Sequence, residues 1–255
     1  MYEKRVLAFI DVLGFEEAVN KTMDREEENE FETNKIKELL EEMSLKIKDT
    51  FKLDDNGTIN QFSDSIIISY PMKDDSKIVK IIINIMFLCS NILNKGHFLR
   101  GAIVCDNLYH KDNIVFGPAL IKACKMEKKL ALYPRIILDE NIISLTKNQH
   151  SKKENELIKK ITLKDFDGLY YINIFNSINY IVGKKDGILV YFNSLRNNII
   201  ELGKQKEKAN NKSKYLWLKE KYNKCLNRYK RKYVNNEKEK EEPELYKYIS
   251  KLTLI

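Results

Sequence analysis

Apolar residues gather near the start of the chain and end at a single acidic residue. The five residues from Val6 to Ile10 are apolar, Asp11 follows them, and Gly14 interrupts the pattern soon afterwards. A short continuous apolar run that ends at a turn signal is typical of a buried β-strand. The pattern therefore predicts a strand that carries the Asp11 carboxylate to one end of a sheet.

A second acidic residue lies between two further apolar segments, residues 58–62 and 66–70. The three residues that separate them are Ser63, Asp64 and Ser65, and Ser and Asp favour tight turns because their side chains bond to nearby backbone groups. The sequence predicts a hairpin with Asp64 at its bend. If the first strand lies beside this hairpin, the two carboxylates meet at one edge of the sheet.

The rest of the chain alternates between helical and strand-like patterns. Helices are predicted over residues 16–51, 76–94 and 118–130, and strands over residues 99–105, 113–116, 135–138 and 170–175. The order strand, helix, strand, strand, helix, strand is the ferredoxin-like βαββαβ pattern. We therefore expect an α+β fold, an antiparallel sheet with helices on one face, over residues 1–180, and a basic helical C-terminal extension over residues 181–255.

Three features predict a cytoplasmic protein that makes no membrane contact. The N-terminus has no basic segment followed by an apolar core of the length that signal peptides have. The longest apolar segment, residues 78–93, is interrupted by Lys80, Asn84, Ser90 and Asn91, which predicts a buried helix and not a membrane span. The 4 cysteines form no CxxC pair or regular framework, which favours reduced thiols.

The net charge of +8 belongs to the C-terminal part of the chain. Twelve Lys or Arg and two Glu lie between residues 204 and 232, which leaves a slightly acidic remainder. Apolar and aromatic residues recur there at helical spacing, in the set Tyr215, Leu218, Tyr222, Cys225, Leu226, Tyr229 and Tyr233. The favoured interpretation is a solvated helix that packs this aromatic seam on the domain or on a second copy, so nucleic-acid binding is not expected. A basic rim that attracts phosphates or RNA is the alternative.

Asp11 and Asp64 together favour a metal site. Each aspartate alone would more often be a helix cap or an ordinary turn residue. Two converging carboxylates, however, are the hard oxygen ligands that Mg²⁺ prefers, and water and substrate phosphates complete its coordination.

The residues around both aspartates resemble the two metal-binding motifs of class III nucleotidyl cyclases. The likeness is carried by residues 9–15 (Phe-Ile-Asp-Val-Leu-Gly-Phe) and 62–65 (Phe-Ser-Asp-Ser). Together with residues 99–103 (Leu-Arg-Gly-Ala-Ile) and 133–136 (Tyr-Pro-Arg-Ile), the sequence looks most like the bacterial pyrimidine cyclases of Pycsar-type anti-phage defence. The resemblance covers roughly residues 5–176.

The resemblance implies a reaction and a metal site. In these enzymes the ribose 3′-hydroxyl attacks the α-phosphorus of its own triphosphate, and pyrophosphate leaves. Asp11 and Asp64 would bind two Mg²⁺ or Mn²⁺ ions, with the backbone carbonyl of Val12 as a further ligand. Gly14 and Phe15 would shape the loop that holds the phosphates.

The sequence departs from the purine cyclases at four positions. Ile121 stands where the resemblance places a ribose-orienting Asn, and Lys125 stands where it places the transition-state Arg. Asn60 and Ile114 stand where it places the Lys and Asp that select adenine. The amide of Asn60 can both donate to and accept from a pyrimidine edge, so the substrate is expected to be UTP or CTP, and the residues do not separate the two.

Three more basic residues are candidates for phosphate contacts or structural pairs. Arg100 either binds phosphate or pairs with an acidic neighbour. Lys164 resembles the lysine that holds the triphosphate in class III cyclases, although a solvated loop lysine fits equally well. Arg135 is expected to be structural or to lie at a dimer interface.

The resemblance also implies partners. It implies a head-to-tail homodimer with composite sites, in which Asp11 and Asp64 of one chain face Lys125 and Lys164 of the other. The product, cUMP or cCMP, would act on a separately encoded effector with which no direct contact is expected. The alternative function is a degenerate cyclase-fold module that binds a nucleotide without turning it over.

Overall fold

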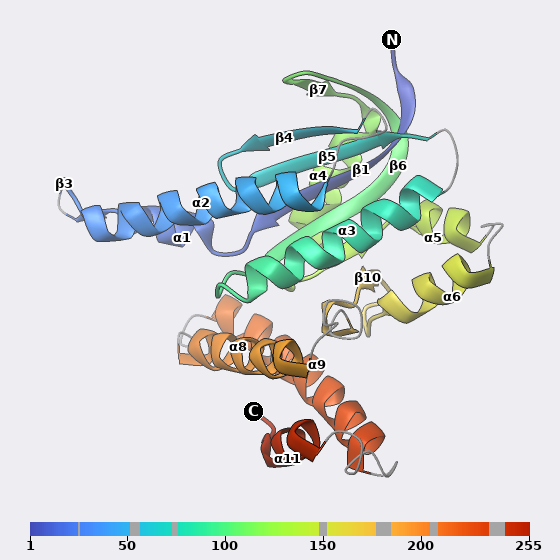
Figure 1. The fold of residues 1–255 in the computed structure, drawn as a ribbon. Helices are drawn as coiled ribbons and strands as arrows, with labels where there is room; N and C mark the ends of the chain where they lie inside the picture. Colours follow the sequence, from blue (N-terminus) through green and yellow to red (C-terminus); the bar gives the residue numbers. More distant parts are fainter. Residues whose placement is uncertain are drawn as a thin grey trace. The chain divides into compact units, whose positions relative to one another are not determined.

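The computed structural model describes residues 1–24, 26–51, 57–72, 76–147, 152–176, 185–204, 209–234 and 243–255 (Figure 1). The chain divides into two compact units. The first contains residues 1–92 and 98–172, and the second contains residues 93–97 and 173–255.

The first unit follows the predicted βαββαβ order. Its elements are β1 (Glu3–Val12), α1 (Phe15–Asn20), β2 (Met23–Asp24), β3 (Glu27–Glu28), α2 (Glu30–Thr50), β4 (Thr58–Phe62), β5 (Ser65–Pro71), α3 (Ser76–Leu93), β6 (Leu99–Lys111), β7 (Ile114–Phe116), α4 (Pro118–Leu130), β8 (Ile136–Leu138), α5 (Glu140–Lys147), α6 (Lys152–Ile161), β9 (Thr162–Lys164) and β10 (Tyr170–Ile172). The pattern is made by β1, α2, β4, β5, α3 and β6, which confirms the predicted α+β class.

The main sheet has the strand order β4-β5-β1-β6-β8-β10-β9. The strand β1 is antiparallel to both β5 and β6, so the βαββαβ part is antiparallel as predicted. The strand β8 then pairs in parallel with β6, which makes the whole sheet mixed. In the register of β1 and β6, Asp11 lies opposite Arg100 and Val12 lies opposite Leu99.

Side chains of β1 alternate between two covered faces. Leu7 lies in a buried cluster with Val104 of β6 and with Ala119 and Ala123 of α4. Val6, Ala8 and Ile10 are also buried, and their side chains point to the opposite face because strand residues alternate. Figure 1 shows α3 in front of the sheet and α4 behind it. The helix α4 thus adds a layer on the second face, beyond the single layer that was expected.

The predicted helix over residues 16–51 is divided in two. The helix α1 ends at Asn20, the short hairpin of β2 and β3 follows, and α2 begins at Glu30. The side chain of Asn29 accepts a hydrogen bond from the backbone nitrogen of Glu32 at 3.3 Å, which is the usual N-cap arrangement. The predicted late strand is also shorter, because β10 ends at Ile172 and a 3₁₀ turn, η1 (Ile174–Asn176), follows.

The helix α3 is the apolar helix that was predicted to be buried. By length and composition alone it could cross a membrane, the one such helix in the described part of the chain. However, 61% of its 18 residues are buried within the protein, as in the core helix of a soluble protein. Ile81, Ile85 and Leu88 have no exposed surface.

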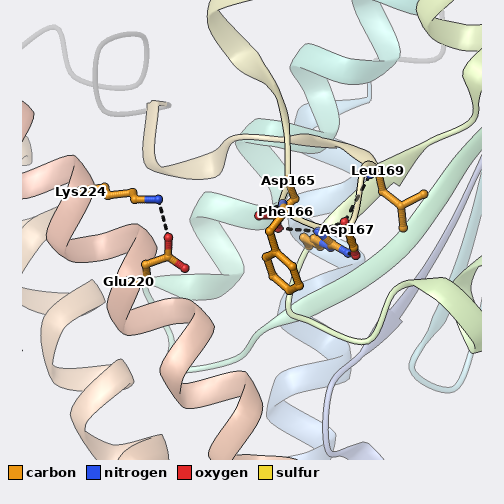
Figure 2. A network of polar contacts seen from close by, with 7 residues as sticks. Asp165, Phe166, Asp167, Leu169, Glu220 and Lys224 are labelled. Carbon is orange, nitrogen blue, oxygen red and sulfur yellow. Dashed lines mark hydrogen bonds and ion pairs between the residues drawn. The ribbon is translucent and has the colours of Figure 1, made fainter.

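The second unit contains η1, α8 (Lys185–Lys204), α9 (Ala209–Val234) and α11 (Pro243–Lys251). The aromatic seam of α9, which was expected to pack on the domain or on a second copy, packs within this unit instead. The ring of Phe192 on α8 meets the rings of Tyr222 and Tyr229 edge to face, at centroid distances of 6.3 and 5.2 Å. The charged side of α9 carries an ion pair between Glu220 and Lys224, one turn apart (Figure 2).

Candidate functional site: two aspartates at the end of the central strands

Asp11 lies on the face of the sheet that α4 covers, two residues after Phe9, which packs on the same buried cluster. On the neighbouring strand, Arg100 places two nitrogens near Asp11 Oδ2, Nη2 at 3.1 Å and Nε at 3.3 Å. The same Nε lies 2.8 Å from Oε1 of Glu127, which α4 contributes. The guanidinium of Arg100 thus bridges two carboxylates that come from different elements.

Asp64 lies in the turn between β4 and β5 and adjoins Asp11. Ser63 adopts a left-handed conformation with φ of 54°, which bends the hairpin sharply just before Asp64. Ser65, the first residue of β5, donates a long hydrogen bond of 3.5 Å from Oγ to Asp11 Oδ1. Burial, together with the hydrogen bond and the charge of Asp11, raises the pKa of Asp64 to about 6.

This pair of carboxylates fits a divalent cation. Two adjacent carboxylates repel each other when both are ionised, and a bound cation removes that repulsion. Across the described ranges there is no group of three or more His, Cys, Asp or Glu residues that could hold a metal by themselves. A cation bound to Asp11 and Asp64 would therefore complete its coordination with backbone carbonyls, water and phosphate oxygens, as Mg²⁺ commonly does.

The turn that follows Asp11 is compact. Val12 is buried, and the backbone nitrogen of Leu13 donates to the carbonyl of Phe98 at 2.8 Å. Gly14 has φ of 83°, a conformation that glycine adopts without strain, and its carbonyl accepts a hydrogen bond from Ala18 at 3.1 Å. Phe15 then opens α1, so the chain passes from β1 into a helix within three residues.

Asn60 belongs to a second polar group on the same face of the sheet. With its amide nitrogen turned toward its neighbours, Asn60 donates to the carbonyls of Asp112 at 3.0 Å and Ile59 at 3.1 Å and lies 2.7 Å from Nε2 of His110. Nδ1 of His110 lies 2.7 Å from Oγ of Ser69. In this orientation the amide oxygen of Asn60 can accept a hydrogen bond from a ligand.

Lys125 and Lys164 are not brought to the two aspartates within one chain. Ala119, Ala123 and Glu127 form the buried side of α4, whereas Lys125 is exposed. Lys164 ends β9, and four strand spacings separate β9 from β1 in the sheet, which is about 19 Å. The prediction that both lysines act on the aspartates of another chain therefore stays a prediction.

Glu127 is a site residue that the sequence reasoning missed. It follows Ala119 and Ala123 at four-residue intervals, so it lies on the apolar side of an amphipathic helix. A carboxylate on that side needs a partner, because burying an unpaired charge is costly. That pattern was the signal that could have revealed it.

Arg135 is held inside the first unit, in agreement with its predicted structural role. Its side chain has no exposed surface and forms ion pairs with Asp165 and Asp167. Figure 2 shows these two aspartates in the loop between β9 and β10, where Asp167 also accepts a hydrogen bond from the backbone of Leu169 at 3.2 Å. The guanidinium also lies 5.2 Å from the ring centroid of Tyr133. The cluster fixes the loop that follows Lys164.

Comparison with known proteins gives distant structural likenesses. No protein-family model matches the sequence, and a search of curated proteins finds no significant match. Among solved structures, the chain is similar to the adenylyl cyclase CyaB from P. aeruginosa, with 16% identity over 68% of this chain and 94% of that one and a TM-score of 0.43. It is also similar to a bacterial light-regulated adenylyl cyclase, with 12% identity over 68% of this chain and 92% of that one and a TM-score of 0.42. A third likeness is to the catalytic core of a rhodopsin-guanylyl cyclase with converted specificity. The identity is 12% over 67% of this chain and 95% of that one, and the TM-score is 0.39.

Proposed function

We propose that the protein is a metal-dependent nucleotidyl cyclase that converts UTP or CTP into its 3′,5′-cyclic monophosphate and pyrophosphate. The observation that carries the proposal is the contact between Asp11 and Asp64. These two carboxylates come from a central strand and from a hairpin turn, and their contact helps to raise the pKa of Asp64 to about 6. Such a pair is unfavourable when both carboxylates are ionised, and Arg100 supplies a positive charge to Asp11. A divalent cation bound to both carboxylates would relieve the remaining repulsion, which supports a metal site.

The reaction would form a bond between the ribose 3′-oxygen and the α-phosphorus while the bond to pyrophosphate breaks and the 3′-hydroxyl loses its proton. When bound, Mg²⁺ or Mn²⁺ would make that hydroxyl more acidic and neutralise the departing phosphates. Asp11, Asp64 and the carbonyl of Val12 would hold two such ions. Gly14 and Phe15 would shape the wall of the phosphate site, since they turn the chain sharply beside Asp11.

The proposed pyrimidine base rests on the replacement of the adenine-selecting Lys and Asp by Asn60 and Ile114. When His110 and the carbonyl of Asp112 fix the nitrogen of Asn60, its oxygen offers a hydrogen-bond acceptor. Cytosine can donate its amino group to that acceptor, and uracil can donate its ring N–H, so CTP and UTP are both allowed.

The positions of Lys125 and Lys164 support a composite site. Because both are exposed and lie away from Asp11 and Asp64 of their own chain, a head-to-tail homodimer is the arrangement that would bring them to the substrate. Lys125 would then stabilise the transition state and Lys164 would hold the triphosphate. Arg100 contacts Asp11 directly, so a role in binding phosphate would require it to leave that carboxylate.

The cellular role that goes with this chemistry is signalling in anti-phage defence. The protein would act in the cytoplasm and release cUMP or cCMP to a separately encoded effector. A second candidate function is a cyclase-fold module that binds a nucleotide without catalysis. Ile121 favours it, because this side chain is 56% exposed on α4 and cannot form a hydrogen bond with a ribose.

The test is to incubate the purified full chain with each of the four ribonucleoside triphosphates and Mn²⁺, and to measure cyclic products and pyrophosphate by mass spectrometry. We expect one cyclic pyrimidine nucleotide, and we expect Asp64→Asn to abolish it. Asp106→Asn is a matched control, because the side-chain contact that Asp106 makes in the described part of the chain is a local hydrogen bond from the backbone of Asn107, which an amide oxygen can also accept.

Each other result would overturn a defined part of the proposal. Products from ATP or GTP would overturn the base preference. Full activity of Asp64→Asn with an unchanged metal requirement would overturn the metal site. Tight nucleotide binding without release of pyrophosphate would favour the binding module.

A further inference from the structure

Three charged side chains from three different elements meet beside the two aspartates. Asp11 comes from β1, Arg100 from β6 and Glu127 from α4. Their side chains are 17%, 28% and 8% exposed, so the cluster is largely shielded from water. Charges in such a place interact strongly, because less water is present to screen them.

Arg100 is shared unequally between its two partners. Its Nε–H is aligned for a hydrogen bond with Oδ2 of Asp11 at 3.3 Å, although the same nitrogen lies closer, at 2.8 Å, to Oε1 of Glu127. That oxygen of Glu127 is buried and has no aligned hydrogen bond in the described part of the chain. A small rotation of the guanidinium would therefore give Glu127 the bond that it lacks.

A cation at Asp11 would compete with Arg100. The guanidinium takes Oδ2 of Asp11, and Ser65 donates a long hydrogen bond to Oδ1. A metal ion that uses Asp11 needs one of these oxygens and is repelled by the positive charge nearby. Glu127 offers the guanidinium another anion, so Arg100 can give up Asp11 without becoming an unpaired charge in a shielded place.

We propose that Arg100 and Glu127 form a counter-ion switch for the metal site. Arg100 neutralises Asp11 while no metal is bound, and Glu127 takes over the guanidinium when a metal binds to Asp11. Both are positioning residues, and the inference rests on the metal site of the proposed function. The switch predicts opposite effects of removing its two members on metal affinity in the absence of nucleotide.

The experiment is a calorimetric titration of the full chain with Mn²⁺ at pH 7.5, without nucleotide. Arg100→Gln removes the competing cation, so Mn²⁺ should bind about tenfold more tightly than to the wild type. Glu127→Gln leaves Arg100 fixed on Asp11, so Mn²⁺ should bind about tenfold more weakly. Arg100→Lys keeps the charge and should stay closer to the wild type than Arg100→Gln.

Two further variants keep the test decisive. Lys122→Gln is the matched control, because Lys122 also lies on α4 and pairs with Asp139 at 2.6 Å, away from Asp11. It should leave the affinity unchanged. The double variant Arg100→Gln with Glu127→Gln removes both charges together, and it should bind Mn²⁺ as tightly as Arg100→Gln does. The double variant takes the place of Glu127→Gln in the comparison if that single variant does not fold.

The outcomes separate the switch from the metal site. If wild-type binding depends on Asp64 but Arg100→Gln and Glu127→Gln shift it in the same direction or not at all, the switch is wrong and the metal site stands. If the wild type binds no Mn²⁺, or binds it equally well after Asp64→Asn, the metal site and the switch are both overturned.

Discussion

Replacing Asp64 with Asn should stabilise the metal-free protein, although it should destroy the proposed activity. The substitution keeps the size of the side chain and an oxygen that can accept hydrogen bonds, and it removes the negative charge beside Asp11. Burial and Asp11 raise the pKa of Asp64 from 3.8 to about 6. A carboxyl whose pKa is higher in the folded state than in the unfolded state lowers the stability as the pH rises through that interval. Above pH 6 the wild type therefore carries the full cost of ionising Asp64.

The size of the effect follows from the pKa. A shift of about two pH units corresponds to about 3 kcal/mol of unfolding free energy when nothing screens it. The turn that holds Asp64 is partly open to solvent, which weakens such interactions, so we expect Asp64→Asn to gain about 1–2 kcal/mol. The gain should shrink as the pH is lowered from 6 to 4, because Asp64 of the folded wild type becomes protonated over this interval.

The assay is urea unfolding at pH 7.5 in EDTA, repeated with Mn²⁺ and at pH 4. In EDTA the variant should be more stable than the wild type, whereas Mn²⁺ should stabilise the wild type more than the variant, since a ligand of the folded state raises its stability. Asp106→Asn should change neither. If Asp64→Asn is less stable than the wild type in EDTA at pH 7.5, the two carboxylates do not oppose each other and the reasoning fails.

Three further predictions concern stability. Arg135→Gln should cost about 3–5 kcal/mol in urea unfolding because it leaves the buried Asp165 without its cation, and adding Asp165→Asn should recover part of this; additive costs would contradict the ion pair. Burial and Arg5 lower the pKa of His110 to about 4, so the melting temperature should fall as the pH drops from 6.5 to 4. The variant His110→Gln should show a smaller fall of the melting temperature over this interval. An equal fall in the variant would mean that other groups cause the pH dependence. Gly101→Ala would place a Cβ 2.2 Å from the carbonyl oxygen of Phe9. Gly14→Ala should cost about 1 kcal/mol in urea unfolding, because Gly14 has a positive φ, and Gly101→Ala should cost several times as much. Equal costs would contradict the close approach of β1 and β6.

The local pattern of the sequence was enough to predict the elements that carry the site. The strand before Asp11, the hairpin around Asp64 and the buried helix α3 all follow from apolar periodicity and turn residues, which act over a few neighbours. The seam of α9 could be predicted for the same reason. These features require no knowledge of which segments meet in space.

Features that depend on distant segments could not be predicted. The parallel pairing of β8 with β6 and the position of α4 on the second face are decided by the packing of the whole sheet. The same holds for His110, which reaches Asn60 from 50 positions away in the chain. Glu127 is the intermediate case, since its place on an apolar helix face was visible but its partner Arg100 on β6 was not.

The two metal-binding candidates belong to parts of the sheet that differ in how they can open. The strand β1 lies between β5 and β6, so the backbone around Asp11 is hydrogen-bonded within the centre of the sheet. The strand β4 is an edge strand, and Asp64 lies in the turn that joins it to β5. Amide hydrogens of central strands exchange with solvent through global unfolding, whereas those of edge turns exchange through local opening. The backbone at Asp11 is thus held in place by the central strands, whereas the turn that carries Asp64 can move to accommodate a ligand between the two carboxylates.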